Sequence, residues 1–180
     1  MKLLAISGTI VGSKTGAVLN SVASKIKEQY SEVEVETINL KDFDVEFCDG
    51  RDPSAYTGDT RKIIDKITNA DCYIIATPIF QASIPGTLKN LFDLLPVEAM
   101  KNKGVSVLAT SGSYNHYLVM ENQLKPILSY FKAYTLPSYV YIHRDHFNEH
   151  NEVVDKEMVE RLHRFINDSV SFFGAMHTKQ

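Results

Sequence analysis

DCYIIAT at residues 71–77 and GVSVLAT at residues 104–110 are the two stretches of sequence that decide the fold. Both are almost uninterrupted runs of apolar, β-branched or small residues, which is the composition of a strand that is buried on both faces. Strands of this kind occur in parallel sheets, because the crossover connections place helices on each face. The two runs therefore predict two central strands of a helix-covered parallel sheet.

Shorter apolar runs complete the predicted sheet, and segments with apolar residues at helical spacing separate the strands. The expected strands are residues 2–7, 34–39, 71–77, 104–110 and 139–143. Helices are expected around Val18, Val22 and Ile26; at 59–69; around Leu88, Leu91, Phe92 and Leu95; at 117–131; and from Val159 through Phe173, ending near Gly174. Right-handed crossovers favour a doubly wound α/β fold for residues 1–180 as a single domain: a five-stranded parallel sheet of order 2-1-3-4-5 with helices on both faces.

The composition of the 180-residue chain favours a cytoplasmic protein with a small-molecule partner. Its 19 basic and 22 acidic residues give a formal charge of −3 and are well mixed, so we expect no nucleic-acid partner. No apolar run reaches the roughly 20 residues that span a bilayer. The apolar stretch within MKLLAISGT at the start is too short for a secretory signal. Cys48 and Cys72 are the only cysteines, and the histidines after residue 142 are irregularly spaced. We therefore expect neither disulfides nor a metal site.

The loop after the first strand is suited to an anion. SGTIVGSKTG at residues 7–16 combines four hydroxyl side chains, three glycines, one cation and no carboxylate at the start of a helix, where the helix dipole favours negative charge. The candidate phosphate ligands are Ser7, Thr9, Ser13, Lys14 and Thr15. The glycine spacing excludes a Walker A loop and the dinucleotide GxGxxG, and the missing acidic residues exclude a phosphorylation receiver. An ordinary strand-to-helix turn with Ser13 or Thr15 as N-cap is the alternative.

The loop after the third strand offers a flat, partly apolar surface. TPIFQASIPG at residues 77–86 contains two prolines, an aromatic residue, an amide and small residues, and it runs directly into a helix. Such a surface at the edge of a doubly wound sheet suits a planar heteroaromatic ring. The candidate residues for this contact are Pro78, Ile79, Phe80, Gln81, Ala82 and Ser83. Composition alone equally allows a connector whose apolar residues cover the core or a subunit interface.

TPIFQASIPGTLKNLFDLLP at residues 77–96 resembles the flavin loop and following helix of the NADPH-dependent FMN reductase family, with the pattern T-P-x-Y-x-x-S-x-P-G-x-L-K-N-x-x-D. Only Phe80 departs from it, in place of tyrosine. The resemblance implies a flavodoxin-like fold, FMN as cofactor or flavin substrate, NADPH or NADH as hydride donor, and a homodimer or homotetramer. The alanine-rich loop with DLLP is similar to members that supply reduced flavin to two-component monooxygenases, so a flavin-dependent monooxygenase is a candidate partner.

The loop after the fourth strand is similar to the family's T-G-G turn beside the flavin pyrimidine ring. It contributes the candidate flavin contacts Ser111, Gly112, Ser113 and Tyr114, with Ser111 in place of one glycine. Backbone N–H groups in such a turn stabilise the negative charge of reduced flavin. In many relatives an arginine stands at the position of Lys14, and a lysine offers a point charge rather than a planar fork.

These observations predict an NAD(P)H-dependent FMN reductase whose reduced flavin passes electrons to a further small-molecule acceptor. No side chain is expected to act as a catalytic acid or base, because the flavin itself accepts the hydride. His116 is accordingly interpreted as a helix-start residue. The alternatives are an FMN-containing quinone or azo reductase, a flavodoxin-type electron carrier, and a flavin-free α/β interaction module. A carrier usually has a strongly acidic docking face, which a mixed charge of −3 does not favour.

Overall fold

The parallel sheet has the predicted strand order. The computed structural model describes residues 1–177 and contains strands β1 (Lys2–Ser7), β2 (Glu34–Asn39), β3 (Cys72–Pro78), β4 (Gly104–Ser111), β5 (Tyr134–Thr135) and β6 (Val140–His143). The order is β2-β1-β3-β4-β5, and every pairing is parallel. β6 also pairs with β4, beyond the end of β5, so the two short strands share the fifth position. This is the order of the flavodoxin-like doubly wound fold.

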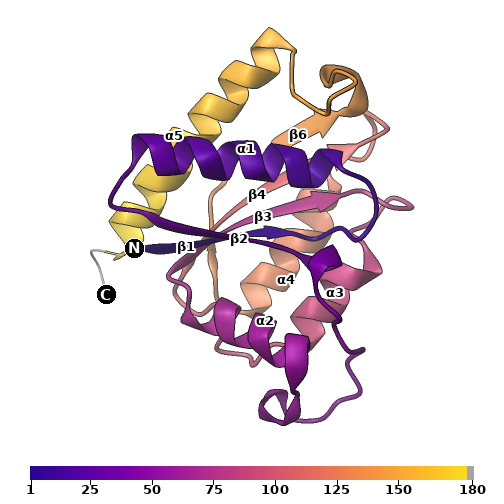
Figure 1. The fold of residues 1–180 in the computed structure, drawn as a ribbon, viewed down its shortest axis with the longest axis vertical. Coiled ribbons are helices and arrows are strands. Elements are labelled where there is room, and N and C mark those ends of the chain that lie inside the picture. The colour runs from indigo at the N-terminus through magenta and orange to yellow at the C-terminus, as the bar shows by residue number, and fades with distance from the viewer. Residues whose placement is uncertain (178–180) are drawn as a thin grey trace.

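Helices cover both faces of the sheet, as predicted. α1 (Lys14–Gln29) and α5 (Lys156–His177) lie on one face, and α2 (Gly58–Asn69), α3 (Gly86–Asp93) and α4 (Lys125–Tyr130) lie on the other (Figure 1). Short 3-10 turns occupy Leu40–Asp42, Pro53–Ala55 and Arg144–His146. Because alternate residues of each strand point to opposite faces, one strand contributes to two core layers.

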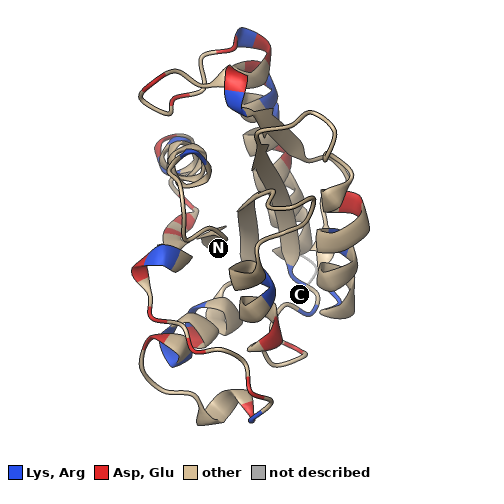
Figure 2. Cartoon of the chain, turned by 90° about the vertical axis from the view of Figure 1, so that its right-hand side faces the viewer, with Lys and Arg blue, Asp and Glu red and all other residues tan. Residues whose placement is uncertain are grey.

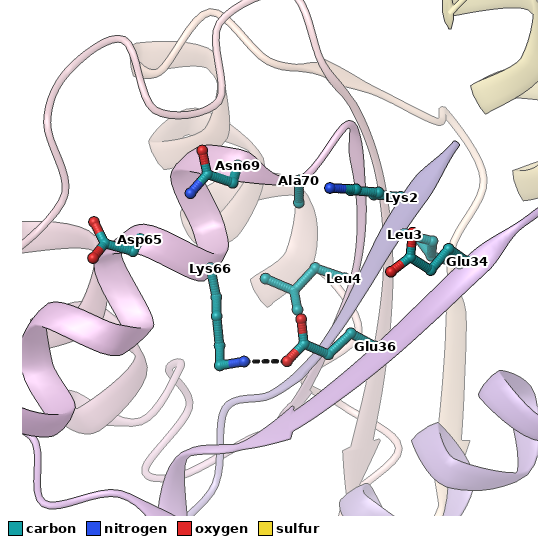
Figure 3. A pocket seen from close by; sticks show the side chains of 9 residues that line it. All are labelled: Lys2, Leu3, Leu4, Glu34, Glu36, Asp65, Lys66, Asn69 and Ala70. Atoms are coloured by element: carbon teal, nitrogen blue, oxygen red, sulfur yellow. Dashed lines mark hydrogen bonds and ion pairs between the residues drawn. The ribbon is translucent and has the colours of Figure 1, made fainter.

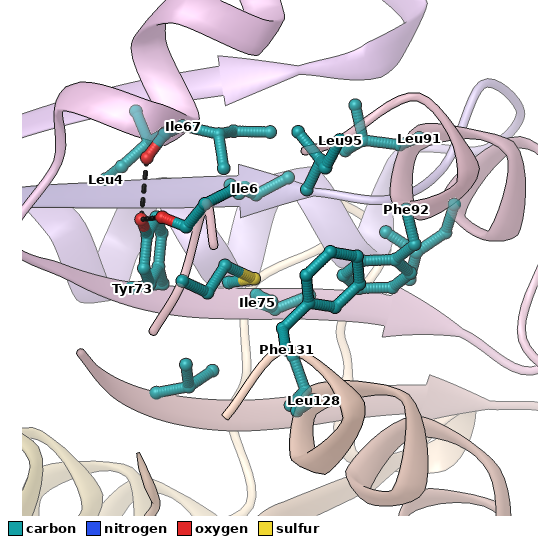
Figure 4. Close-up of a cluster of buried hydrophobic side chains, with 14 of the residues drawn as sticks. Leu4, Ile6, Ile67, Tyr73, Ile75, Leu91, Phe92, Leu95, Leu128 and Phe131 are labelled. Atoms are coloured by element: carbon teal, nitrogen blue, oxygen red, sulfur yellow. Dashed lines mark hydrogen bonds between the residues drawn. The ribbon is translucent and has the colours of Figure 1, made fainter. Parts of the chain in front are cut away.

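The layer beneath α2, α3 and α4 is the larger of the two. Tyr73 and Ile75 of β3 belong to one hydrophobic cluster with residues of all three helices, as Figure 4 shows: Ile67 of α2, Leu91 and Phe92 of α3 and Leu128 of α4. Within this layer the Tyr73 hydroxyl donates a 2.6 Å hydrogen bond to the carbonyl of Ile67, which satisfies a polar group that burial would otherwise penalise.

Two predicted helices differ in detail. The segment expected to be one helix at 117–131 begins with a π-helical turn, Met120–Leu124, before α4. Pro126 has no N–H to donate four residues back, and its ring crowds that carbonyl, so the preceding turn widens. The last helix continues to His177 instead of ending near Gly174, because Gly174 does not adopt the left-handed conformation that ends helices.

Burial of Cys72 predicts a pH-dependent loss of stability. The thiol is buried in β3, and desolvation raises its pKa from 9.0 to about 12. Above pH 9.0 the unfolded chain releases this proton while the folded chain keeps it, so stability falls as pH rises, by up to about 1.4 kcal/mol per pH unit. Urea unfolding between about pH 8 and about pH 10 measures this slope. The Cys72→Ala variant should show a shallower slope; an equal slope in both proteins would contradict the assignment.

The charged side chains are dispersed over the surface. Blue and red segments alternate along the outer helices and loops in Figure 2, in keeping with the mixed charge of the sequence. Among residues 1–177, no helix has the length and apolar character required to cross a membrane.

Candidate functional site

The three loops singled out in the sequence meet at the carboxyl edge of the sheet, where β1, β3 and β4 end. Backbone hydrogen bonds join them: Gly8 N–H donates to the carbonyl of Ala76 at 2.8 Å, and Ile79 N–H donates to that of Thr110 at 3.0 Å. Between them lies a cavity of about 280 Å³. Its lining consists of Val11, Gly12, Ser13, Lys14, Thr15, Pro78, Ile79, Phe80, Thr110, Ser111, Gly112, Arg144 and Phe147.

The first loop brings Ser13, Lys14 and Thr15 to the cavity at the start of α1. Gly12 precedes them at φ +80°, a left-handed conformation that glycine adopts without strain. In the described structure the Ser13 side chain makes no capping hydrogen bond to the helix. The Thr15 hydroxyl is buried and lies 2.6 Å from the Thr110 hydroxyl of β4. Hydroxyl groups and first-turn N–H groups therefore converge on one end of the cavity.

Ser7, the last residue of β1, and Thr9 of the first loop are buried and do not line the cavity. Thr9 is buried, and its hydroxyl donates a 2.5 Å hydrogen bond to the carbonyl of Val11, which shapes the loop. The Ser7 hydroxyl is buried and has no hydrogen-bond partner among residues 1–177. A Cβ on Gly16 would lie 3.9 Å from it, so Ser7 faces the first turn of α1.

The second loop presents Pro78, Ile79 and Phe80 to the cavity, and its tip forms a tight turn. Gln81 and Ala82 both adopt positive φ, 46° and 59°, between paired backbone groups of Phe80 and Ser83. Left-handed conformations at two residues that are not glycine cost free energy, about 1 kcal/mol each.

Gln123 of the π-helical turn braces the tip of this loop. Its amide nitrogen donates to the carbonyl of Ala82 at 3.2 Å, and its amide oxygen accepts a hydrogen bond from the Ser83 hydroxyl. Gln81, Ala82 and Ser83 lie outside the cavity lining. Phe80 lines the cavity and is 40% exposed, so this residue is accessible to a ligand.

The third loop is held by side chains of β6. The Ser111 hydroxyl accepts a hydrogen bond from Ser113 N–H at 3.1 Å, and the Tyr141 hydroxyl donates to the Ser113 carbonyl. The Tyr114 ring stacks on His143 with ring centroids 3.7 Å apart. Ser111 and Gly112 line the cavity, whereas Ser113 and Tyr114 lie beyond it.

Five cavity residues were not among the candidate contacts expected from the sequence: Val11, Gly12, Thr110, Arg144 and Phe147. Arg144 and Phe147 follow β6, in a segment for which the sequence predicted no strand, helix or binding role. A Cβ on Gly112 would lie 3.9 Å from Arg144 Cδ, which puts this side chain beside the third loop. The sequence feature that could have indicated Arg144 and Phe147 is their position directly after the last predicted strand, at the same edge of the sheet as the three loops.

The chemistry of the lining fits FMN. Lys14 and Arg144 supply positive charge, Ser13 and Thr15 supply hydroxyls, and none of the residues that line the cavity carries a carboxylate. Pro78, Ile79 and Phe80 form the apolar side. A phosphate suits the end of the cavity at the start of α1, and a planar ring suits the apolar side that the second loop forms. Backbone hydrogen bonds join the loops that would hold the two groups.

A second cavity, of about 230 Å³, lies at the opposite end of the sheet (Figure 3). It is lined by the first residues of β1 and β2 and by the end of α2, and Lys66 pairs with Glu36 across it. Glu34 and Asp65 add further carboxylates. Lys2 also lines this groove, so its charges are mixed. Ligands of doubly wound sheets bind at the carboxyl ends of strands, so this groove at the amino ends of β1 and β2 is not the candidate site.

Comparison with known proteins identifies the family. The model of the NADPH-dependent FMN reductase family matches residues 1–147. The chain is 54% identical over 162 residues to an NAD(P)H-dependent FAD/FMN reductase of Geobacillus thermodenitrificans strain NG80-2, covering 90% of this chain and 88% of that protein. It is 26% identical to the NADH-dependent FMN reductase SfnF of Pseudomonas putida, covering 96% and 93%. The solved apo form of the NADH:FMN oxidoreductase EMOB shares the fold, with a TM-score of 0.79 at 24% identity over 94% of this chain and 89% of that one. The chain therefore belongs to the NADPH-dependent FMN reductase family.

Proposed function

We propose that the protein transfers hydride from NADPH or NADH to FMN held in the cavity between the three loops, and that a small-molecule acceptor then takes the electrons. Membership of the family makes it an NAD(P)H-dependent FMN oxidoreductase. The observation that carries the location is the cavity itself, in which a cationic, hydroxyl-bearing end adjoins a flat apolar end with no carboxylate in the lining.

Each loop has one task in this proposal. The Ser13 hydroxyl, the Lys14 ammonium and the first-turn N–H groups of α1 bind the phosphate, with Thr15 fixed by Thr110. Residues 78–83 support one side of the ring, and the backbone of residues 111–114 borders the other. Bound FMN supplies the redox chemistry, so the protein contributes binding, orientation and electrostatics.

The structure supports this enzyme over an electron carrier, because an electron carrier docks through a strongly charged face and the charges here are mixed. A quinone or azo compound as final acceptor is the second candidate function. It uses the same site, and steady-state assays with several acceptors distinguish the possibilities.

We further propose that residues 1–180 form one domain and that the protein is cytoplasmic. We also propose that it forms a homodimer or homotetramer. A flavin-dependent monooxygenase is the candidate recipient of the reduced flavin. Exposed aromatic residues support an oligomer: Phe47 and Tyr130 are 83% and 65% exposed, and Tyr130 borders a groove of about 700 Å³ between the segment after β2 and helices α3 and α4. Large exposed apolar surfaces mark interaction sites.

The first test is an absorbance spectrum of the purified protein with FMN, followed by anaerobic NADPH and then NADH. We expect the visible flavin band to accompany the protein through gel filtration and to bleach with at least one donor. Bound flavin that neither donor reduces would favour the electron carrier. Protein that neither binds FMN nor promotes its reduction would overturn the proposed function.

A further inference from the structure

Lys14, the one cation in the first loop (residues 7–16), contacts a segment that lies far along the chain. Its ammonium nitrogen donates to Asn151 Oδ1 at 3.1 Å in a partly buried contact, and it lies 5.6 Å from the centroid of the Phe147 ring. Both partners belong to the connection between β6 and α5. The ammonium is therefore fixed by one hydrogen bond and one cation–π contact.

The connection that carries these partners is an ordered hairpin. Phe147 and Val153 form an antiparallel bridge, and Asn148 N–H donates to the carbonyl of Glu152 at 2.9 Å. The Asn148 side-chain oxygen accepts hydrogen bonds from the N–H groups of His150 and Glu152, each at 2.9 Å. These bonds tie the hairpin tip to its base, so the tip has a defined position.

Asn151 stands at the hairpin tip with φ +62°. Asparagine and glycine adopt this left-handed conformation more readily than other residues. Asparagine differs from glycine here only by the side chain whose oxygen reaches Lys14. The backbone requirement and the contact with Lys14 can therefore be separated by a single substitution.

We propose that Asn151 and Phe147 are positioning residues that orient the Lys14 ammonium toward the phosphate of FMN; this inference rests on the proposed function. A lysine ammonium is a point charge on a flexible stem and lacks the planar fork of an arginine. It has three N–H donors. One N–H donor bonds to Asn151, and the other two remain for phosphate oxygens. The contact with the Phe147 ring restricts the conformations of the Lys14 side chain, so binding the phosphate costs little further side-chain entropy.

The test compares affinities for FMN and for riboflavin, which has the same ring but no phosphate. Asn151→Gly keeps the left-handed backbone and removes the amide. We expect it to weaken FMN binding roughly threefold to tenfold, the effect of losing one ordinary hydrogen bond, because the lost bond acts on FMN only through Lys14; riboflavin affinity should be unchanged. Fluorescence titration of either flavin with the protein measures both affinities.

Asn102→Gly is the matched control, because Asn102 has φ +60° and precedes β4 at the other end of the sheet. It should change neither affinity. In a Lys14→Met background, Asn151→Gly should have almost no further effect on FMN, since its action depends on the ammonium. Phe147→Leu should also weaken FMN more than riboflavin.

The outcomes separate this inference from the proposed function. Unsubstituted protein that binds neither flavin overturns both. If the unsubstituted protein binds FMN more tightly than riboflavin, but Asn151→Gly binds FMN equally well or better, the proposed function stands and the positioning role of Asn151 is wrong. Equal weakening of FMN and riboflavin assigns the hairpin to general packing of the site and likewise overturns the positioning role.

Discussion

Replacing Lys14 with glutamate is expected to weaken FMN binding about 100-fold, because reversing a charge near a phosphate changes the binding free energy by about 3 kcal/mol at a partly exposed site. Lys14 lines the cavity at the start of α1, where the helix dipole already favours an anion. A carboxylate there would oppose both the phosphate and the dipole. Isothermal titration with FMN at a fixed ionic strength measures the loss.

Riboflavin distinguishes a phosphate effect from damage to the ring site. Its affinity should change by less than about threefold in Lys14→Glu, since it carries no charge for the new carboxylate to repel. Lys27→Glu, in the last turn of the same helix, is the control for a change in net charge. The loss in Lys14→Glu should shrink as salt rises, because partly exposed charges are screened. A similar loss for both flavins would contradict the assignment of Lys14 to the phosphate.

Gly104→Val is expected to lower the free energy of unfolding by about 3 kcal/mol, because the start of β4 has no space for a side chain. A Cβ at this position would lie 2.8 Å from Phe173 Cδ1 and 3.2 Å from Phe172 Cε1, both in α5. Phe173 is buried within the layer between the sheet and α1 and α5, so its ring has little room to move. α5 would have to shift away from the central strand.

Thermal unfolding measures this loss, which should appear as a decrease in Tm of roughly 6–12 °C for a chain of this size. Gly174→Ala is the control: apart from the helix's own backbone and the adjacent residues, no atom of residues 1–177 lies within 4 Å of a Cβ added there. Alanine favours a helix over glycine by up to about 1 kcal/mol. Adding Phe173→Leu to Gly104→Val should recover part of the stability by relieving the overlap. A Tm within about 2 °C of the unsubstituted protein would show that α5 adapts to the added side chain.

The fold followed from the sequence wherever a local pattern carried the information. β3 and β4 appeared within one residue of the predicted bounds, because a strand buried on both faces must be apolar almost throughout. β5 was not predicted, since two residues of strand contain no periodicity and Tyr134 and Thr135 become a strand only by pairing with β4. The π-helical turn likewise depends on packing around Pro126 as well as on its sequence.

The residues of the candidate site were likewise predictable only where a local pattern marked them. Hydroxyl, glycine and lysine residues cluster within ten positions of the first loop, so the sequence alone indicated an anion site there, and the second loop carried the pattern of the family. Arg144, Phe147 and Asn151 carry no such local pattern. Asn151 is 137 residues from Lys14, and the pairing of β6 with β4 brings its hairpin to the same edge of the sheet.

The sequence by itself thus determined the strand order, the layers and the loops that form the site, because these depend on periodicity and on short-range chemistry. Only the tertiary structure decided which side chains line the cavity. Ser7 and Thr9 are buried and do not line it, Tyr114 stacks on His143 outside the lining, and a distant hairpin reaches Lys14. The physical reason is that contacts between distant segments depend on how the strands pair and the helices pack, and no local run of residues encodes them.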